Sequence, residues 1–181
     1  MSGAVYYRWP AVTLHWLAAL LIIGGFALGL SMVDLPFSPQ RIKYYSWHKW
    51  IGISVWLLAV LRLLWRLVSP PPPLLPMPAW QRRAATATHH LLYALMLVIP
   101  LSGWLYSSAA GVSVVYLGLV PLPDLVAASK PLAANLKLVH KALNVSLLVL
   151  VLLHIAAALK HHLFDGDETL ARMLPFLRKS H

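Results

Sequence analysis

The chain contains no cysteine among its 181 residues and only five acidic residues. The missing cysteine excludes disulfides, thiolate metal sites, iron–sulfur clusters and covalently attached c-type haem, so any haem has to be held non-covalently. Charged residues make up only 11% of the chain, whereas hydrophobic residues make up 60%. This balance excludes an ordinary soluble globule and indicates one small membrane-embedded domain over residues 1–181.

Hydropathy predicts an all-α protein with four membrane-spanning helices. The expected spans are about residues 10–33, 46–67, 85–106 and 134–160, each long enough to cross the hydrocarbon core of a bilayer. The first span carries no charged side chain and is longer than the core of a signal peptide, so we expect it to be retained. The lipid bilayer is the expected surrounding, and we expect no nucleic-acid partner.

Proline and glycine residues indicate where the predicted helices end or are interrupted. Six of the ten residues in 69–78 are proline, which predicts a stiff, extended connector outside the membrane. The uncharged run 84–123 is too long for one helix, so we assign the helix to its first part. The candidate breaks are Pro100, Gly103, residues 107–111, and Pro121 with Pro123. We expect a partly apolar loop or a short interfacial segment over 112–126.

Basic residues are distributed unevenly between the two sides of the predicted bundle. Nine of the fifteen lie near the termini and the second connection: Arg8, Arg62, Arg66, Arg82, Arg83, Lys160, Arg172, Arg178 and Lys179. The others lie around the first and third connections: Arg41, Lys43, Lys49, Lys130, Lys137 and Lys141. Because basic residues concentrate on the cytoplasmic side of membrane proteins, we expect both termini in the cytoplasm.

Four histidines fall at two depths of the predicted bundle. His140 and His154 are fourteen residues apart in the fourth span, about 40° short of four helical turns and about 21 Å along the axis. A histidine within a span is costly unless it has a partner. Alternating helix directions place His48 at the outer depth and His15 at the inner depth. The expected pairs are therefore His48 with His140 and His15 with His154.

The type of metal site follows by elimination. The four spans contain no Asp or Glu, which excludes a di-iron carboxylate centre, and an isolated histidine pair cannot form a closed zinc site. Haem b needs only one histidine on each face of the ring. The pattern therefore predicts a four-helix bundle with two buried b-type haems. The alternative, polar contacts between haem-free helices, requires the shared stripe to be accidental.

Three further residues have spacings that suit these sites. Gly29 is fourteen residues after His15 and Gly52 is one turn after His48, so both leave room for the bulk of a haem, although close helix packing is the alternative. Arg62 is fourteen residues after His48 and is placed to pair with a haem propionate.

Two more histidines are candidates near the inner depth. His161 is seven residues after His154, about 20° off the same stripe and about 10 Å nearer the cytoplasm. There it is placed to hydrogen-bond a quinone and relay protons; a helix-end histidine favoured by the helix dipole is the alternative. His90, near the start of the third span, is the rival of His15 for the inner haem.

Lysines surround the outer histidines. Lys49 follows His48, whereas Lys137 and Lys141 flank His140. This positive charge predicts that a small anion is drawn toward the outer pair. The alternative is that these lysines reach lipid head groups from the helix ends.

Several motifs resemble the bacterial cytochrome b561 family of di-haem, four-helix proteins. They are TLHW at 13–16, WHKWIGIS at 47–54, the V-x-R-x-x-x-R pattern at 60–66, and the pair His140 and His154. The family includes the cytochrome b subunits of hydrogenase and formate dehydrogenase. The tail ALKHHLFDGDETLARMLP at 158–175 is similar to the short stand-alone members, among them superoxide oxidase.

The resemblance implies a multi-pass protein of the bacterial inner membrane whose haem iron is bound by His15, His48, His140 and His154. It further implies that superoxide reaches the outer haem through a positive periplasmic funnel and that electrons leave to ubiquinone near His161. The first expected function is therefore superoxide oxidase. The alternative is a relay subunit that passes electrons from a hydrogenase- or dehydrogenase-type partner to quinone. The first function requires no partner protein.

Overall fold

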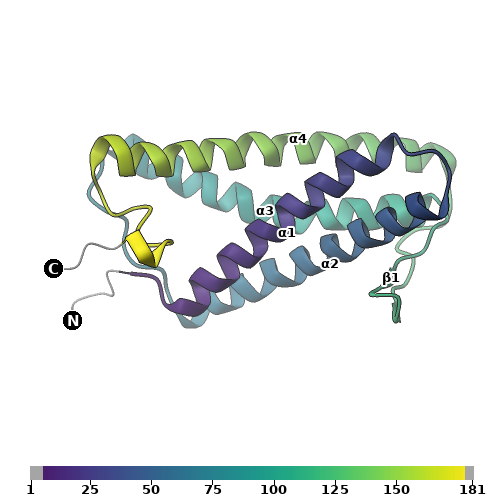
Figure 1. Cartoon of the computed structure of the whole chain (residues 1–181), viewed down its shortest axis with the longest axis horizontal. Helices are drawn as coiled ribbons and strands as arrows, with labels where there is room; N and C mark the ends of the chain where they lie inside the picture. Colours follow the sequence, from purple (N-terminus) through teal and green to yellow (C-terminus); the bar gives the residue numbers. More distant parts are fainter. Residues whose placement is uncertain (1–5, 178–181) are drawn as a thin grey trace.

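Four long helices form the bundle in the computed structural model, which describes residues 6–177 (Figure 1). They are α1 (Trp9–Val33), α2 (Pro39–Val68), α3 (Ala79–Ala109) and α4 (Lys130–Lys160). By length and composition, each is able to cross a membrane. The expected all-α, four-helix membrane fold is confirmed. Arg178 and Lys179, assigned above to the cytoplasmic side, lie outside the described residues.

The two ends of the bundle are distinguished by their connections. We call the end with the α1–α2 and α3–α4 connections the outer end, and the opposite end, with the α2–α3 connection, the inner end (Figure 1). A small core between the two ends consists of Ala18, Val55, Ala59 and Met96. Many other large apolar side chains are exposed, as expected for a surface that faces lipid rather than water.

Two helices begin earlier than hydropathy predicts because serine caps lie outside the apolar stretch. Ser38 caps α2, which therefore begins at Pro39 instead of residue 46. Ser129 caps α4, which begins at Lys130 instead of residue 134. In both caps the serine oxygen accepts a hydrogen bond from a backbone N–H of the first turn.

Helix α3 continues through Pro100 and Gly103, so the expectation that these residues break it is wrong. Membrane helices tolerate such residues because neighbouring helices and side chains compensate for the disturbed backbone. The helix ends at Ala109, within the candidate break at residues 107–111.

The connection between α3 and α4 contains a short hairpin. Strand β1 (Val115–Tyr116) pairs antiparallel with β2 (Val120–Pro121), within the segment expected to be a partly apolar loop. The indole N–H of Trp50 in α2 donates to the Val115 carbonyl at 2.7 Å, which anchors the hairpin. Leu119 at its tip is 80% exposed. The hairpin projects from the outer end of the bundle (Figure 1).

Beyond α4 the chain turns back across the inner end. The π-helix η1 (His161–Asp165) stops at Gly166, whose φ of +64° lies in the left-handed region. Residues 166–177, here called the C-terminal segment, end in the 3-10 helix η2 (Pro175–Leu177). The Trp16 indole N–H donates to the Met173 carbonyl at 2.7 Å, which holds the segment against α1.

Candidate functional site

The structure brings together both histidine pairs expected from the sequence. At the outer end, the ring centres of His48 (α2) and His140 (α4) are 6.3 Å apart. At the inner end, those of His15 (α1) and His154 (α4) are 6.2 Å apart. A metal–imidazole bond is about 2 Å long, so two rings on opposite sides of one metal ion have centres about 6 Å apart. Both separations fit a metal held between two imidazoles.

A backbone carbonyl orients His48. The Nδ1–H of His48 donates to the Gly25 carbonyl at 3.0 Å, which leaves Nε2 as the nitrogen able to bind metal. A Cβ atom added to Gly29 would lie 3.2 Å from the His48 ring. Gly29 therefore makes room for the imidazole itself, whereas a Cβ at Gly52 would meet nothing within 4 Å. Of the two glycines, only Gly52 faces open space that a bulky ring could share.

A serine orients His140. The Ser102 hydroxyl donates its only proton to the Ile99 carbonyl at 2.7 Å, so it has to accept the hydrogen bond from His140 Nδ1–H at 2.8 Å. This assigns the proton to Nδ1 and leaves Nε2 free, as in His48. A Cβ atom at Gly103 would lie only 3.0 Å from the His140 ring. Each imidazole of the outer pair therefore packs against a glycine, His48 against Gly29 and His140 against Gly103.

The inner pair has a different, cationic neighbour. Arg62 Nη2 lies 3.3 Å from Nδ1 of His15, and since a guanidinium only donates, this nitrogen has to accept. The Arg62 guanidinium also lies 5.3 Å from the centre of the Tyr93 ring. Arg62 therefore reaches the inner histidine pair, at the depth expected from its spacing after His48.

A third histidine lies beside the inner pair, but it is His89 rather than His90. The ring centre of His89 is 5.5 Å from that of His154, whereas His90 is exposed. Neighbouring residues on a helix point about 100° apart, so only one of the two can face the bundle. His89, and not His90, is therefore the alternative to His15 as a ligand of the inner haem.

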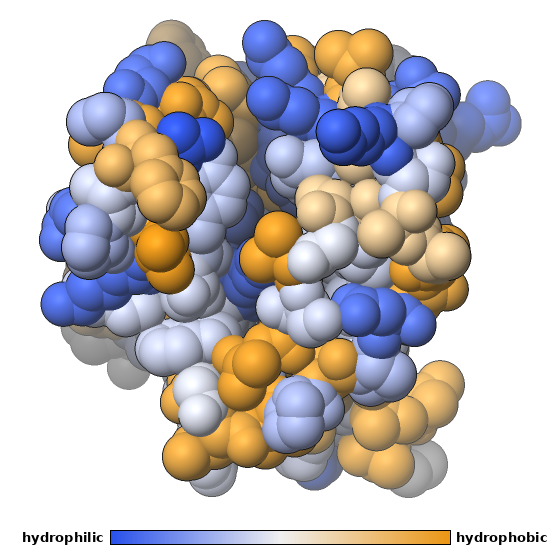
Figure 2. Space-filling view, turned by 90° about the vertical axis from the view of Figure 1, so that its right-hand side faces the viewer, coloured by the Kyte–Doolittle hydropathy of each residue, from blue (hydrophilic) through white to orange (hydrophobic). Residues whose placement is uncertain are grey.

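The three lysines expected to attract an anion differ in their surroundings. The Lys49 ammonium donates to the Val112 carbonyl at 3.2 Å and so helps to hold the α3–α4 connection. Lys137 and Lys141 are exposed. Lys137 lines a cavity of about 520 Å³ between the end of α3 and the start of α4, together with Lys130 and Tyr106. Figure 2, which looks onto the outer end, shows hydrophilic side chains around a hollow.

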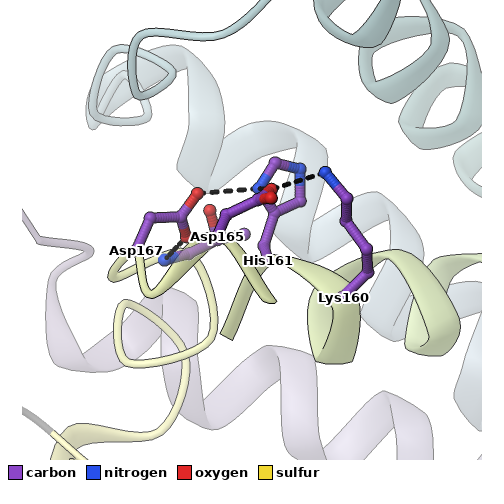
Figure 3. A network of polar contacts seen from close by, with 5 residues as sticks. Lys160, His161, Asp165 and Asp167 are labelled. Carbon is purple, nitrogen blue, oxygen red and sulfur yellow. Dashed lines mark hydrogen bonds and ion pairs between the residues drawn. The ribbon is translucent and has the colours of Figure 1, made fainter. Parts of the chain in front are cut away.

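At the inner end, His161 belongs to a polar network at the π-helix (Figure 3). Its Nδ1 lies 2.7 Å from an Asp167 oxygen and 3.0 Å from an Asp165 oxygen. Asp165 also accepts a hydrogen bond from Lys160 at 2.6 Å. Partial burial alone would raise the pKa of Asp167, but hydrogen bonds from Thr169 and His161 outweigh it and lower that pKa.

Several residues of both sites were missed by sequence reasoning. Ser102 and Gly103 have the depth of His140, yet serine and glycine are common in membrane helices and gave no distinct signal. His89 could not be separated from His90 without knowing how α3 is rotated. Asp167 and Arg172 lie beyond the spans, and only the folding of the C-terminal segment brings them to the inner end.

A family model described as prokaryotic cytochrome b561 matches residues 6–176. The chain belongs to this family. It is 40% identical over 170 residues to cytochrome b561 homolog 2 of Escherichia coli, covering 88% of this chain and 86% of that protein. It is 34% identical over 176 residues to a probable superoxide oxidase, CybB, of Yersinia pestis, covering 93% and 96%.

Membership of the cytochrome b561 family establishes the general character of the protein. It is a multi-pass protein of the inner membrane that binds haem b and takes part in electron transfer. The residues present suit that cofactor, because each pair offers one imidazole from each of two helices at a separation that fits a metal between them. Both outer imidazoles also have their Nδ1 hydrogen-bonded and Nε2 free.

Proposed function

We propose that this chain is a superoxide:ubiquinone oxidoreductase with two haem b groups. Two superoxide anions each give up one electron at the outer end and leave as dioxygen. Ubiquinone gains two electrons and two protons at the inner end and becomes ubiquinol. Each haem b, when bound, supplies a one-electron redox centre. The likeness to a relative named probable superoxide oxidase supports this reaction.

Four histidines would hold the two haem groups in this proposal. His48 and His140 would bind the outer one, and His15 and His154 the inner one. The ring separations of 6.3 Å and 6.2 Å support these pairs. Arg62 would pair with a propionate of the inner haem, since its guanidinium lies beside His15.

The observation that carries the choice of superoxide is the cavity of about 520 Å³ at the outer end. Its lining includes Lys130 and Lys137 and no acidic residue. Lys137 is three residues before His140, so the two lie on one face of α4 about 4.5 Å apart along its axis. A small anion drawn into this cavity would arrive within one helical turn of the outer histidine pair. Lys141 and Lys49 would add to the attracting charge.

The inner end supports quinone reduction through His161. Asp167 and Asp165 occupy its Nδ1, which leaves Nε2 to bond a quinone carbonyl. The adjacent carboxylates would resupply the proton that His161 transfers. In this proposal the inner end and both termini face the cytoplasm, as the nine basic residues on that side favour.

The test follows the visible spectrum of the purified, oxidised protein in detergent while superoxide is supplied. We expect the α-band of reduced haem b to rise within the mixing time and to decay when ubiquinone is added. Superoxide dismutase is the control, because it removes superoxide and should abolish the rise. A haem spectrum that dithionite reduces but superoxide leaves unchanged would contradict the proposed donor.

A relay subunit is the second candidate function. The observation that favours it is the apolar hairpin at the outer end, where Leu117 is 52% and Leu119 80% exposed. A hydrogenase- or dehydrogenase-type partner would cover such a surface. This function predicts that the chain purifies with a large partner in near-equal amount, and that superoxide does not reduce the isolated chain.

A further inference from the structure

Three arginines gather at the inner end of the bundle. Arg62 and Arg66 are one turn apart on α2, and their guanidinium carbons lie 5.3 Å and 6.0 Å from the centre of the Tyr93 ring. Arg172 comes from the C-terminal segment. Each of the three acts electrostatically on the Tyr7 hydroxyl, and Arg172 contacts Pro73 in the connection that follows α2. Within residues 6–177, none of the three forms an ion pair with a carboxylate.

Arg172 is the most unusual of the three because its charge is buried. Its side chain is only 8% exposed. Nη1 donates to the Pro73 carbonyl at 2.6 Å, but the buried Nε has no partner among the described residues. A guanidinium has five N–H donors, and burying one with an unsatisfied donor and no counter-charge is costly. A bound anion would supply both the missing counter-charge and the missing acceptor.

The C-terminal segment is held close to the inner histidine pair. The Tyr6 hydroxyl donates to Glu168 at 2.7 Å, and Trp16 donates to the Met173 carbonyl. Trp16 follows His15 and its ring lies edge-on to the His15 ring at 5.3 Å. Burial raises the pKa of Tyr7, and the arginine charges oppose that rise without reversing it, so Tyr7 is a neutral hydroxyl beside the cations. An anion at this place would find donors on α2 and on the C-terminal segment.

We propose that Arg62, Arg66 and Arg172 form a binding site for a carboxylate or phosphate group, and that its occupancy closes the C-terminal segment over the inner end. Planar guanidinium groups bind both kinds of oxyanion through paired hydrogen bonds. The anion comes either from a propionate of the inner haem or from the phosphate of a lipid in the same leaflet. The first source rests on the proposed haem site. The second does not.

The experiment measures amide hydrogen exchange of residues 168–174 in full-length protein in nanodiscs. Arg172→Gln is compared with wild type and with Arg83→Gln, which removes an exposed charge from the same end. Because Arg172→Gln removes charge-assisted hydrogen bonds, exchange in this segment should speed about tenfold or more. Arg83→Gln should leave exchange unchanged.

Two further arms identify the source of the anion. If it is a propionate, wild-type protein reconstituted with haem dimethyl ester should exchange as fast as Arg172→Gln. If it is a lipid phosphate, the ester should have no effect, and phosphatidylglycerol should slow exchange in wild type but not in Arg172→Gln. Comparing wild type with native and esterified haem, and with and without phosphatidylglycerol, needs no substitution, so these comparisons test the proposal even if Arg172→Gln does not fold.

Two results would overturn the proposal. One is exchange in Arg172→Gln equal to that in Arg83→Gln. The other is faster exchange that neither the ester nor the lipid reproduces in wild type, since Arg172 would then serve only to hold Pro73. The measurement uses neither superoxide nor quinone, so it stays informative if the proposed reaction is wrong.

Discussion

The outer and inner histidine pairs have nearly equal ring separations but opposite surroundings. At the outer pair, the Gly25 carbonyl and the Ser102 hydroxyl accept the Nδ1 protons of His48 and His140. At the inner pair, Arg62 donates to His15 Nδ1. Binding of metal through Nε2 requires a proton on Nδ1. The outer pair is therefore preorganised for the proposed ligation, whereas His15 would have to exchange its contact with Arg62 for a different one.

The difference in charge has a consequence for electron transfer. Positive groups near a redox centre favour its reduced form. Arg62 and Arg66 lie near the inner histidines, whereas the outer imidazoles contact only neutral hydrogen-bonding groups. In the proposed reaction, Arg62 and Arg66 would therefore stabilise an electron that has reached the inner site.

The largest expected effect is the loss of a single haem. His140→Ala should remove the outer haem and spare most of the inner one, so the haem content should fall by about half. Pyridine haemochrome analysis of purified protein measures this ratio. His90→Ala is the matched control, because His90 is exposed and should be replaceable. Equal loss of both haems would contradict pairing by depth.

The second prediction separates the two candidates at the inner site. His15→Ala should abolish the inner haem, whereas His89→Ala should retain it with a perturbed spectrum, since His89 lies beside His154 without belonging to the expected pair. Low-temperature spectra and electron paramagnetic resonance distinguish the two haems. The reverse outcome would assign His89, instead of His15, as the ligand.

A smaller effect should follow from removing the partner of a ligand. Ser102→Ala leaves the His140 N–H without an acceptor, and such changes weaken metal binding about 10–100-fold. Haem dissociation to an apo-globin acceptor measures this loss at the outer site. Ser146→Ala is the control on α4, because its hydroxyl only donates to the Ala142 carbonyl. Unchanged dissociation in Ser102→Ala would show that the preorganisation is unimportant.

The charge at the outer end is tested by Lys137→Gln combined with Lys141→Gln. The reaction with superoxide should slow about tenfold at low salt and lose much of its dependence on ionic strength. Stopped-flow spectroscopy follows the rate. Lys160→Gln at the inner end should leave this rate unchanged. Rates identical to those of the wild type would contradict the proposal that these lysines attract superoxide to the cavity.

The smallest effect concerns Asp167 at the inner end. Its pKa is lower in the folded protein than in the unfolded chain, so it contributes stability above about pH 4 that is lost as the pH falls through the lowered value. Asp167→Asn should therefore destabilise the C-terminal segment at neutral pH by less than about 1 kcal/mol. Hydrogen exchange of the Thr169 amide, measured from pH 3 to pH 7, should converge with wild type at the acidic end. A difference independent of pH would exclude the carboxylate as its cause.

Hydropathy and periodicity together predicted the four spans and the two histidine pairs. The spacing of His140 and His154 gave two depths, and alternating helix directions then gave their partners. Periodicity failed where rotation about a helix axis mattered, as for His89 and His90. It also failed beyond the spans, because the contacts of Arg172 and Asp167 depend on how the C-terminal segment folds back. No local sequence pattern predicts that the C-terminal segment folds back across the inner end.

The spacing of fourteen residues from His140 to His154 also has an electrical meaning. It places the two pairs about 21 Å apart along α4, or about two thirds of the hydrocarbon thickness. One charge crossing the whole membrane at 100 mV exchanges about 2.3 kcal/mol with the field. If the inner end faces a negative cytoplasm, each electron passing inward does work against that field. The protein would then store part of the energy of its substrate as membrane potential.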